Sequence, residues 1–473
     1  MDAWQSLSER WNYCSDTLNS GMEGFREAKA VPPPSEPLPE RTFIIDNGGY
    51  TIKAGYSSPS SSDPLESCLV VPNALAKTRD NQIYTGLELE THISDWNEVS
   101  FRRPVEKGYL VNWEAQREIW EHTFFDEKTA RRPEVQCSDF LGTTVILTEA
   151  PNALSSLQKN MDEMIMEEWG FGGYVRYLAP CLNAWNEVCS LFGDPPSQDA
   201  IPSNLPAECM LVVDSGYSHT TVTPVYHGRP LQRAIRRLDI GGKHLTNYLK
   251  ELVSIRQYNM LDETHIVNSV KEAVCYVSHD FDGDMEKTWK GRKGGVSDIV
   301  VDYVLPDPNA HKKGFMRPHD SLLAAEKRKG LMTGVNPSAA EDVLVLGNER
   351  FTVPEILFNP QDIGLQQPGI ADIIMQCLSV IPTGLHPSLL ANIFVVGGNA
   401  LIPGFIERLE TDIRHLAPTE CVVRVRAGPD PIRSTWLGAS RLAANQQTMK
   451  EIAITRQQYQ EYGSAWAWKK FSG

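Results

Sequence analysis

A short acidic, glycine-bearing turn occurs twice in this chain and constrains its fold more than any other feature. Residues 44–49 read Ile-Ile-Asp-Asn-Gly-Gly, and residues 212–216 read Val-Val-Asp-Ser-Gly. Each lies between two β-prone runs, the second at 51–54 or 220–226, which is typical of a β-hairpin. Such a turn offers backbone N–H groups to a phosphate and a carboxylate to its magnesium ion. Two of them, separated by most of a domain, predict the jaws of a phosphate clamp between related halves.

Three segments are candidates for a single nucleotide site. In the first turn, the absence of a Cβ lets a phosphate approach the backbone, and a lysine follows in the outgoing strand as a point charge. Taken alone, that lysine is better explained as a surface residue of the strand. The second turn supplies the opposite wall, and a buried strand ending in a double glycine leaves room for a flat adenosine. The candidates are Asp46, Asn47, Gly48, Gly49, Lys53, Asp214, Ser215, Gly216, Gly397 and Gly398. Asp46 and Asp214 are the candidates to hold Mg²⁺, indirectly through water.

Length and hydrophobic patterning indicate a large α/β protein. The chain has 473 residues, of which 41% are hydrophobic, enough for two or three lobes with substantial cores. Strand-like runs alternate with helical patterns, which favours α/β layers. The expected strands are 42–45, 144–147, 210–213, 220–226 and 393–396, and the expected helices are 112–125, 160–169, 242–253, 266–278 and 404–416.

Charge and cysteine usage exclude several classes of protein. The net charge of -15 and the pI of about 5.3 disfavour a general nucleic-acid binder, because the phosphate backbone repels an acidic chain. The nine cysteines are scattered and form no C-x-x-C pair, which predicts free thiols in a reducing compartment. The sequence has neither a secretory signal nor an apolar run long enough to span a bilayer. We therefore expect a soluble intracellular protein with no membrane partner.

The N-terminal residues 1–30 stand apart from the rest of the chain. Trp4, Leu7 and Trp11 recur at helical spacing, and a proline-rich linker follows at 32–39. One interpretation is a loose tail or a helix packed on its own body. The other is a docking helix for a partner, because exposed tryptophans on one helical face are costly to leave in water.

Residues 283–342 form a basic stretch within an acidic protein, on either side of a short expected strand at 299–304. Charged surface segments are most often solvated loops. The functional alternative is a contact for DNA or for an acidic protein, and both interpretations stay open. The candidate contact residues are Lys312, Lys313, Arg317, Lys327, Arg328 and Lys329.

The order and wording of these segments resemble the actin family from about Arg41 to the C-terminus. Residues 46–55, which read Asp-Asn-Gly-Gly-Tyr-Thr-Ile-Lys-Ala-Gly, look like actin's first phosphate loop. Residues 147–151 and 434–438 are also similar to actin. The resemblance implies an α/β, actin-like ATPase fold, in which two related lobes of two subdomains each surround a nucleotide cleft.

The resemblance also implies further site residues and a division into subdomains. Lys271 and Glu272 would flank the adenosine of ATP or ADP, bound with Mg²⁺, beside the double glycine. The expected divisions are 1–40 for an N-terminal extension, 41–75, 104–185 and 434–473 for subdomain 1, 76–103 for a reduced subdomain 2, 186–240 and 366–433 for subdomain 3, and 241–365 for subdomain 4 with a basic insertion at about 309–340.

Several positions depart from the actin pattern where actin contacts its nucleotide. Gly49 stands in place of a serine that touches the γ-phosphate, and Tyr217 and Ser218 replace an Asp-Gly pair. On the adenine side, Ile402 and Ile432 replace a tyrosine and a lysine. These changes make the second turn bulkier than its actin counterpart, while both turn aspartates remain.

The positions that orient the attacking water in actin are also changed. Actin uses a glutamine and a histidine, and the matching positions here are Leu178 or Ala179, and Thr221. An aliphatic side chain can neither accept the proton of a water molecule nor hold it in line. Phosphoryl transfer to water depends mostly on orientation and electrostatics. The resemblance and these departures from it therefore imply a nucleotide that binds tightly, as a structural cofactor, or not at all, and that turns over very slowly.

Within the family, the phrases at 260–265, 301–307 and 354–360 are similar to the nuclear actin-related subunits of Swr-class chromatin remodellers. That likeness implies a non-catalytic scaffold in a complex that exchanges a variant histone dimer into nucleosomes. Its implied partners are a zinc-finger HIT-type protein, the motor ATPase, and nucleosome or DNA within the complex. The implied location is the nucleus, and a cytoplasmic pool is compatible with the same likeness.

Two other classes of function are weighed against the scaffold. A sugar kinase of the same broad fold needs a separate carboxylate base, and a chaperone-type ATPase needs a substrate domain after the ATPase. The sequence offers no separate base beyond the two turn aspartates and few residues after Trp436. The stretch between Pro72 and Tyr84 is too short for the loop that joins actin protomers, so we expect no filament.

Overall fold

The structure is a computed structural model of the chain, divided into two units, residues 1–37 and residues 38–473. The predicted contact residues Trp4, Leu7, Trp11, Lys312, Lys327, Arg328 and Lys329 lie outside the described residues. Described are residues 37–57, 64–93, 95–96, 99–130, 132, 135–187, 191–193, 205–290, 299–307, 313–320 and 341–472.

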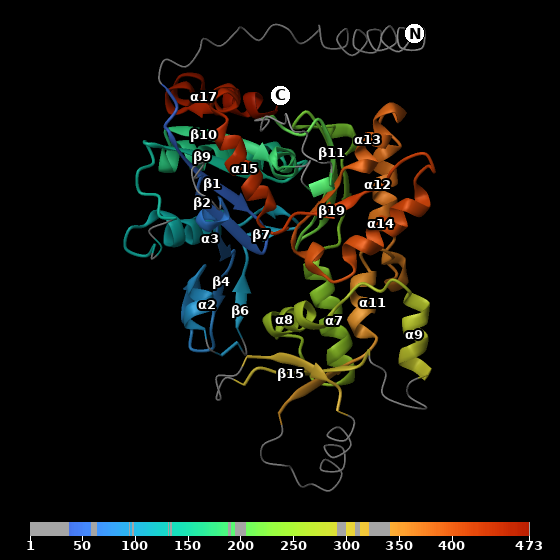
Figure 1. Ribbon diagram of the computed structural model, residues 1–473. Coiled ribbons are helices and arrows are strands. Elements are labelled where there is room, and N and C mark those ends of the chain that lie inside the picture. Colours follow the sequence, from blue (N-terminus) through green and yellow to red (C-terminus); the bar gives the residue numbers. More distant parts are fainter. Residues whose placement is uncertain are drawn as a thin grey trace, which may run out of the picture. The chain divides into compact units, whose positions relative to one another are not determined.

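The first large sheet contains the first glycine-bearing hairpin. Its six strands run in the order β20-β10-β9-β1-β2-β3, with β1 antiparallel to β2 and parallel to β9 (Figure 1). Aliphatic and aromatic side chains of β1 and β9 are fully buried between the sheet and its covering helices. The strands are β1 (Arg41–Asn47), β2 (Thr51–Tyr56), β3 (Leu69–Pro72), β9 (Thr143–Glu149), β10 (Gly173–Leu178) and β20 (Ile454–Thr455).

The second large sheet repeats this plan around the second hairpin. Its order is β13-β12-β11-β18-β19, with β14 also paired to β12. The first strand of the hairpin, β11, is antiparallel to β12 and parallel to β18, as β1 is to β2 and β9. The strands are β11 (Cys209–Ser215), β12 (Thr220–Tyr226), β13 (Arg229–Pro230), β14 (Arg236–Leu238), β18 (Ile393–Val396) and β19 (Val425–Ala427). This repeated topology is what the repeated sequence motif predicts.

Two smaller three-stranded sheets, ordered β5-β4-β6 and β16-β15-β17, and a short β7–β8 ribbon complete the strands of the described residues. Strands β4 and β5 are joined by residues 78–82 alone, so the hairpin carries no long loop. The strands are β4 (Leu75–Lys77), β5 (Ile83–Thr85), β6 (Ser100–Arg102), β7 (Val105–Glu106), β8 (Tyr109–Leu110), β15 (Val301–Val304), β16 (Phe315–Pro318) and β17 (Val343–Leu346).

Helices pack on the sheets and share their hydrophobic clusters. The longer ones are α3 (Trp113–Trp120), α4 (Ser155–Glu163), α7 (Gly242–Arg256), α8 (Thr264–Val274), α9 (Phe281–Lys290), α12 (Ile370–Leu378), α14 (Phe405–Leu416), α15 (Ser434–Ala444) and α17 (Arg456–Ser472). The shorter ones are α2 (Glu88–His92), α5 (Ala179–Leu182), α11 (Glu349–Glu355), α13 (His386–Ala391) and α16 (Gln446–Ile452). Helices α3 and α4 continue as π-helical turns η3 (Glu121–Phe125) and η4 (Met164–Trp169).

The expected helices exist, but several boundaries were wrong. The helix expected at 242–253 continues to Arg256, and the helix expected at 266–278 begins at Thr264. The helix expected at 266–278 ends at Val274, because the backbone N–H groups of Tyr276 and Val277 bond to Arg350 and Pro403 instead of continuing the helix. The helix expected at 160–169 begins earlier, at Ser155. The apolar periodicity of residues 155–159 was too weak to predict this first turn.

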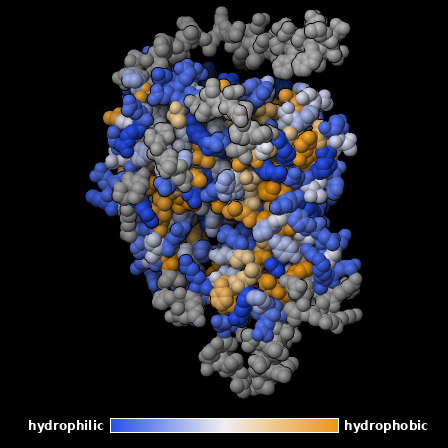
Figure 2. All heavy atoms as spheres, viewed as in Figure 1, coloured by the Kyte–Doolittle hydropathy of each residue, from blue (hydrophilic) through white to orange (hydrophobic). Residues whose placement is uncertain are grey.

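The described surface is mixed in polarity, and the described cysteines are free. Apolar residues form separate patches among hydrophilic ones on the face drawn in Figure 2. The seven cysteines in the described part of the chain are free and buried, in agreement with the expected free thiols. Among the described helices, none combines the length and the apolar character needed to cross a bilayer.

Candidate functional site

A cavity of about 550 Å³ is lined by both glycine-bearing turns and by the end of β18. The three segments that the sequence singled out therefore share one cavity, although they are far apart in the chain. The predicted residues that line it are Asp46, Asn47, Gly48, Gly49, Lys53, Asp214, Gly216, Lys271, Glu272, Gly397 and Gly398.

Ser215 was also predicted to line the site, and this prediction was wrong. Successive side chains of a strand point to opposite faces, so Asp214 faces the cavity and Ser215 faces away from it. The fully buried Ser215 hydroxyl is paired with Thr220 Oγ1 at 2.9 Å and accepts from Asn399 Nδ2 at 3.1 Å. Its role is to fix the base of the second turn.

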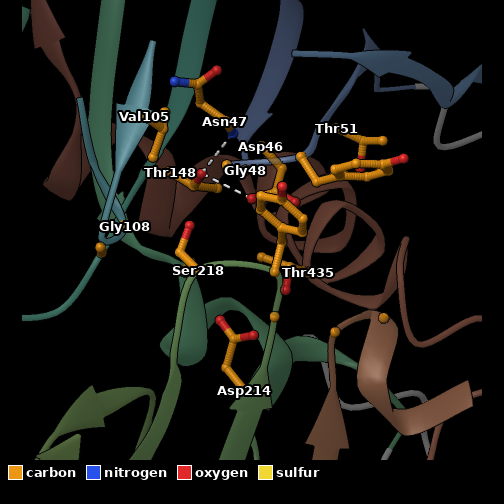
Figure 3. Close-up of a pocket in the computed structure, with 18 of the residues that line it drawn as sticks. Asp46, Asn47, Gly48, Thr51, Val105, Gly108, Thr148, Asp214, Ser218 and Thr435 are labelled. Carbon is orange, nitrogen blue, oxygen red and sulfur yellow. Dashed lines mark hydrogen bonds between the residues drawn. The ribbon is translucent and has the colours of Figure 1, made fainter. Parts of the chain in front are cut away.

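Hydrogen bonds to the neighbouring strand β9 hold the first turn in place. The Thr148 hydroxyl donates to Asp46 Oδ1 at 2.9 Å and accepts from the Asn47 backbone N–H at 3.0 Å (Figure 3). On its other oxygen, Asp46 pairs with Lys53 Nζ at 3.2 Å, and both side chains are nearly buried. Lys53 is therefore part of the site, and the interpretation of it as a plain surface lysine was wrong.

The glycines of the first turn are required by space. A methyl group at Gly48 would lie 2.7 Å from the Thr51 carbonyl oxygen and 3.3 Å from Lys53 Nζ. A methyl group at Gly49 would lie 2.5 Å from the hydroxyl oxygen of Ser218, in the opposite turn. The two turns therefore lie so close together that a single side chain fills the space between them. On the cavity side, no described side chain covers the backbone of the first turn.

The second turn carries the more perturbed carboxylate. Burial and, to a smaller extent, the Asp46 carboxylate raise the pKa of Asp214 to about 6, against the opposing effect of Lys53. Two carboxylates that share a cavity repel each other, so a divalent cation held between them through water would relieve that repulsion. No cluster of three or more metal-ligating side chains occurs among the described residues, so any Mg²⁺ here needs phosphate and water oxygens as further ligands.

The double glycine of the third segment lies directly against the second turn. Gly397 has a φ of +94°, and a methyl group there would lie 2.3 Å from the Ser215 carbonyl oxygen, so the position admits only glycine. Asn399 Nδ2 donates to the Gly216 carbonyl at 3.0 Å. Gly398 faces open space. Bare backbone is therefore available where the sequence predicted a flat adenosine.

The lysine and glutamate on α8 line the cavity from the other side, but both are already engaged. Lys271 Nζ donates to Asn268 Oδ1 at 2.9 Å and to Thr246 Oγ1 at 3.1 Å. Burial lowers its pKa, and Glu272 partly opposes that change. Glu272 accepts from Asn268 Nδ2 at 2.7 Å. This network ties α8 to α7 and presents the two side chains in fixed positions.

An aromatic and cationic cluster beside the cavity was missed by the sequence reasoning. The rings of Tyr50 and Tyr217 lie 4.8 Å apart, and the Arg103 guanidinium lies 4.4 Å and 5.4 Å from their centroids. Asn268 Nδ2 also donates to the Tyr50 hydroxyl at 3.2 Å. Burial raises the pKa of Tyr50 to about 12, against the effect of Arg103. A signal was present, because a tyrosine follows the glycine in both turns.

A second contact joins the small sheet β5-β4-β6 to α8. The Trp96 and His265 rings stack with their centroids 3.8 Å apart, and Trp96 packs against hydrophobic clusters on both sides. Burial and, to a smaller extent, Arg103 lower the pKa of His265 to about 4, so the imidazole is neutral at pH 7. No sequence pattern pointed to this pair.

Comparison with known proteins fits this arrangement. Residues 38–472 match the actin family. This chain belongs to the actin family. It is 66% identical to actin-like protein arp6 of Aspergillus fumigatus, over 94% of this chain and 98% of that protein. It is 49% identical to actin-related protein 6 of Neurospora crassa, over 96% and 98%, and 34% identical to actin-related protein 6 of Drosophila melanogaster, over 89% and 97%. The predicted α/β actin-like fold and the likeness to this branch of the actin family are confirmed.

The actin family generally binds a nucleotide with Mg²⁺, and the residues of this cavity fit such a ligand. Two aspartates face each other, the glycine backbones are bare, and the side-chain oxygen Oδ1 of Asn47 is buried without a hydrogen-bond partner in the described chain. A nucleotide bound in this cavity would supply the anionic phosphates and the flat ring for which these residues leave room.

The positions that the resemblance matches to actin's water-orienting residues are Leu178 or Ala179, and Thr221. Ala179 lines the cavity and Leu178 does not, while Thr221 is buried with its hydroxyl unpaired among the described residues. His219 also lines the cavity. Burial lowers its pKa to about 4, and Arg237 adds to that effect, so His219 is a neutral and weak base at pH 7.

The basic stretch is only partly described. Lys313 is exposed. Arg317 on β16 pairs with Glu341 at 2.8 Å and lies 3.9 Å from Asp302, so part of its charge is compensated inside the protein. The prediction that these two residues contact a partner stays a prediction.

Proposed function

We propose that this protein is a non-catalytic, nuclear structural subunit of a Swr-class chromatin remodelling complex, which exchanges a variant histone dimer into nucleosomes. It binds ATP, or ADP, with Mg²⁺ as a structural cofactor. Its actin-like body scaffolds other subunits, among them a zinc-finger HIT-type protein and the motor ATPase, and contacts nucleosome or DNA within the complex. The relatives named actin-related protein 6 support the choice of this branch of the family.

The observation that carries the proposal is the contrast between the retained and the lost parts of the cavity. Asp46 and Asp214 remain on facing turns, so phosphate and Mg²⁺ have their anchors. By the resemblance, Leu178 or Ala179 takes the place of the residue with which actin orients water, and neither side chain can hold a water in line. His219, with a pKa of about 4, is a poor proton acceptor. Hydrolysis needs an oriented water, whereas binding does not, so the site favours binding without turnover.

The contacts beside the cavity support tight holding of the nucleotide. Arg103 lies over the paired rings of Tyr50 and Tyr217, and cation–π contacts of this kind stabilise by about 0.5 to 2 kcal/mol each. Opening the cavity on this side breaks them. Exchange of a bound nucleotide is therefore slow, as a structural cofactor requires.

A scaffold that stays monomeric also needs a reduced polymer contact. Strands β4 and β5 are connected by residues 78–82 alone, which leaves no long loop to reach a neighbouring protomer. This connection supports the proposal of an actin-like body without a filament.

Two measurements on the full-length protein test the catalytic half of the proposal. Thermal unfolding with ATP and Mg²⁺ is expected to show stabilisation, because a ligand that binds only the folded state raises the free energy of unfolding. Single-turnover hydrolysis is expected to be far slower than that of actin. Hydrolysis at an actin-like rate that Asp214→Asn abolishes would identify an active ATPase instead.

A pull-down from nuclear extract tests the scaffolding half. Full-length protein is expected to recover remodeller subunits. Removal of residues 1–30, or of residues 321–337, which spares strand β16, is expected to weaken that recovery while leaving thermal unfolding unchanged. Recovery of every partner by both shortened proteins would rule out these segments as contacts. Recovery of no remodeller subunit by the full-length protein would sink the proposed complex.

A further inference from the structure

The side chain of Ser218 fills the space that a side chain at position 49 would occupy. A methyl group placed on Gly49 would lie 2.5 Å from Ser218 Oγ and 3.8 Å from Ser218 Cβ. The other close atom, Val105 Cγ1, would lie at 3.4 Å, an ordinary contact distance. The obstacle at Gly49 is therefore specifically the hydroxyl group of Ser218, which comes from the opposite turn.

The backbone around Ser218 is held on several sides. The N-terminus of α7 lies behind it, where the Lys243 N–H donates to the Tyr217 carbonyl at 2.8 Å and the Gly242 N–H donates to the Gly216 carbonyl at 3.0 Å. A methyl group at Gly241 would lie within 2.7 Å of three backbone atoms of this turn. The turn is thus packed too closely to relax, and Ser218 keeps its position.

The neighbours of Ser218 are also anchored. On one side, Tyr217 packs against Tyr50. On the other, the His219 ring lies so close to Gly108 that a methyl group there would be 2.1 Å from its Cε1. With both neighbours fixed, the Ser218 hydroxyl points into the cavity towards the first turn (Figure 3).

The Ser218 hydroxyl has no hydrogen bond to any described residue, and it faces a cavity that also contains Asp46, Asp214 and Lys53. A serine hydroxyl is both a donor and an acceptor. In a cavity whose aspartates are proposed to hold Mg²⁺ through water, the partner that suits this hydroxyl is a phosphate oxygen. In actin the serine of the first turn makes that contact, and here its position is Gly49.

We propose that Ser218 is a phosphate-binding residue that donates a hydrogen bond to the terminal phosphate of a bound nucleoside triphosphate, so that the hydroxyl lost from the first turn is supplied by the second. This inference rests on the proposed binding of a nucleotide. It adds a specificity-determining residue, because a diphosphate has no terminal phosphate at that position. The protein therefore distinguishes ATP from ADP through a contact made by the second sheet.

The test compares ATP and ADP binding to full-length variants, each with Mg²⁺. Ser218→Ala is expected to weaken ATP binding by about 10- to 100-fold, the effect of one hydrogen bond to a charged group, with ADP binding and unliganded melting temperature unchanged. Ser379→Ala, at an exposed serine that follows α12, is the matched control and is expected to change neither affinity.

A swap of the two positions gives a second and independent measurement. Gly49→Ser alone is expected to lower ATP affinity and thermal stability, because the new side chain meets the Ser218 hydroxyl. The double variant Gly49→Ser with Ser218→Gly restores the arrangement of actin and is expected to recover the preference for ATP. Ser218→Ala with an undiminished preference for ATP over ADP would overturn the assignment, and so would a double variant no better than Gly49→Ser.

The measurements distinguish a failure of nucleotide binding from a failure of the Ser218 contact. If neither nucleotide binds the unaltered protein, the proposed structural cofactor is wrong, and the role of Ser218 falls with it. If both nucleotides bind with equal affinity to the unaltered protein and to Ser218→Ala, only the role of Ser218 is wrong.

Discussion

The two glycine-bearing turns share a backbone plan and differ in almost everything attached to it. The first turn is small, with Gly48 and Gly49 packed so tightly that neither admits a methyl group without a shift. The second turn is bulky, with Tyr217, Ser218 and His219 all lining the cavity. The first turn relies on its backbone and on Asp46, whereas the second contributes side chains. One sequence motif thus occurs twice, with a bare backbone in the first turn and bulky side chains in the second.

The largest expected effect comes from the aspartate of the first turn. Asp46→Ala removes the acceptor of the Thr148 hydroxyl and the partner of Lys53, and it removes one anchor for Mg²⁺. We expect the stabilisation by ATP and Mg²⁺ to disappear, a loss of about 4 kcal/mol where ATP is present at a thousand times its Kd. Thermal unfolding with and without ATP measures this loss.

The control for that measurement is Asp362→Ala, at an exposed residue of the 3₁₀-helix η8 (Pro360–Ile363), which should leave the ATP effect intact. If the purified protein carries no nucleotide and its melting temperature does not respond to ATP, the prediction for Asp46 is wrong.

A matched pair of alanine substitutions sharpens the comparison between the turns. A methyl group at Gly48 meets the Thr51 carbonyl oxygen at 2.7 Å, whereas at Gly216 its nearest neighbours lie 3.7 Å and 3.8 Å away. Gly48→Ala is therefore expected to lower the free energy of unfolding by about 1 to 3 kcal/mol, and Gly216→Ala by less than about 1 kcal/mol. Chemical denaturation of the nucleotide-free protein measures both. Equal losses would mean that the two turns are packed alike.

The last expected effect has the opposite sign and depends on pH. Because the pKa of Asp214 is raised to about 6 in the folded protein, its ionised form destabilises the fold above that pH, and the cost disappears as the pH falls towards 4. Asp214→Asn is therefore expected to stabilise the nucleotide-free protein by about 1 to 2 kcal/mol at pH 7.5, and to have no effect near pH 4. Thermal unfolding with a chelator at both pH values measures the difference. A gain of equal size at both would show that the raised pKa is not its cause.

Local chemistry made much of the site predictable from the sequence. The turns follow from aspartate and glycine after aliphatic strands, and the double glycine at Gly397 follows from a backbone that needs a positive φ. Strand alternation also predicts that Ser215 and Asp214 point to opposite faces of the sheet.

Contacts between distant segments set the limit of prediction. Helix α8 stops at Val274 because Arg350 and Pro403 supply acceptors for the following N–H groups, and no local pattern announces such partners. The same holds for Ser218 and Gly49, which share a space although they belong to different sheets. The subdomain boundaries, the partners and the nuclear location stay predictions.

The stacked rings of Trp96 and His265 make Trp96 an intrinsic fluorescence probe of conformational change. The imidazole is neutral at physiological pH because its pKa is held near 4, so the indole lies against an uncharged ring that quenches weakly. Any movement that separates the small sheet β5-β4-β6 from α8 exposes the indole to water and shifts its emission to longer wavelength. The difference spectrum between the unaltered protein and Trp96→Phe would therefore follow the opening of the molecule without any attached dye.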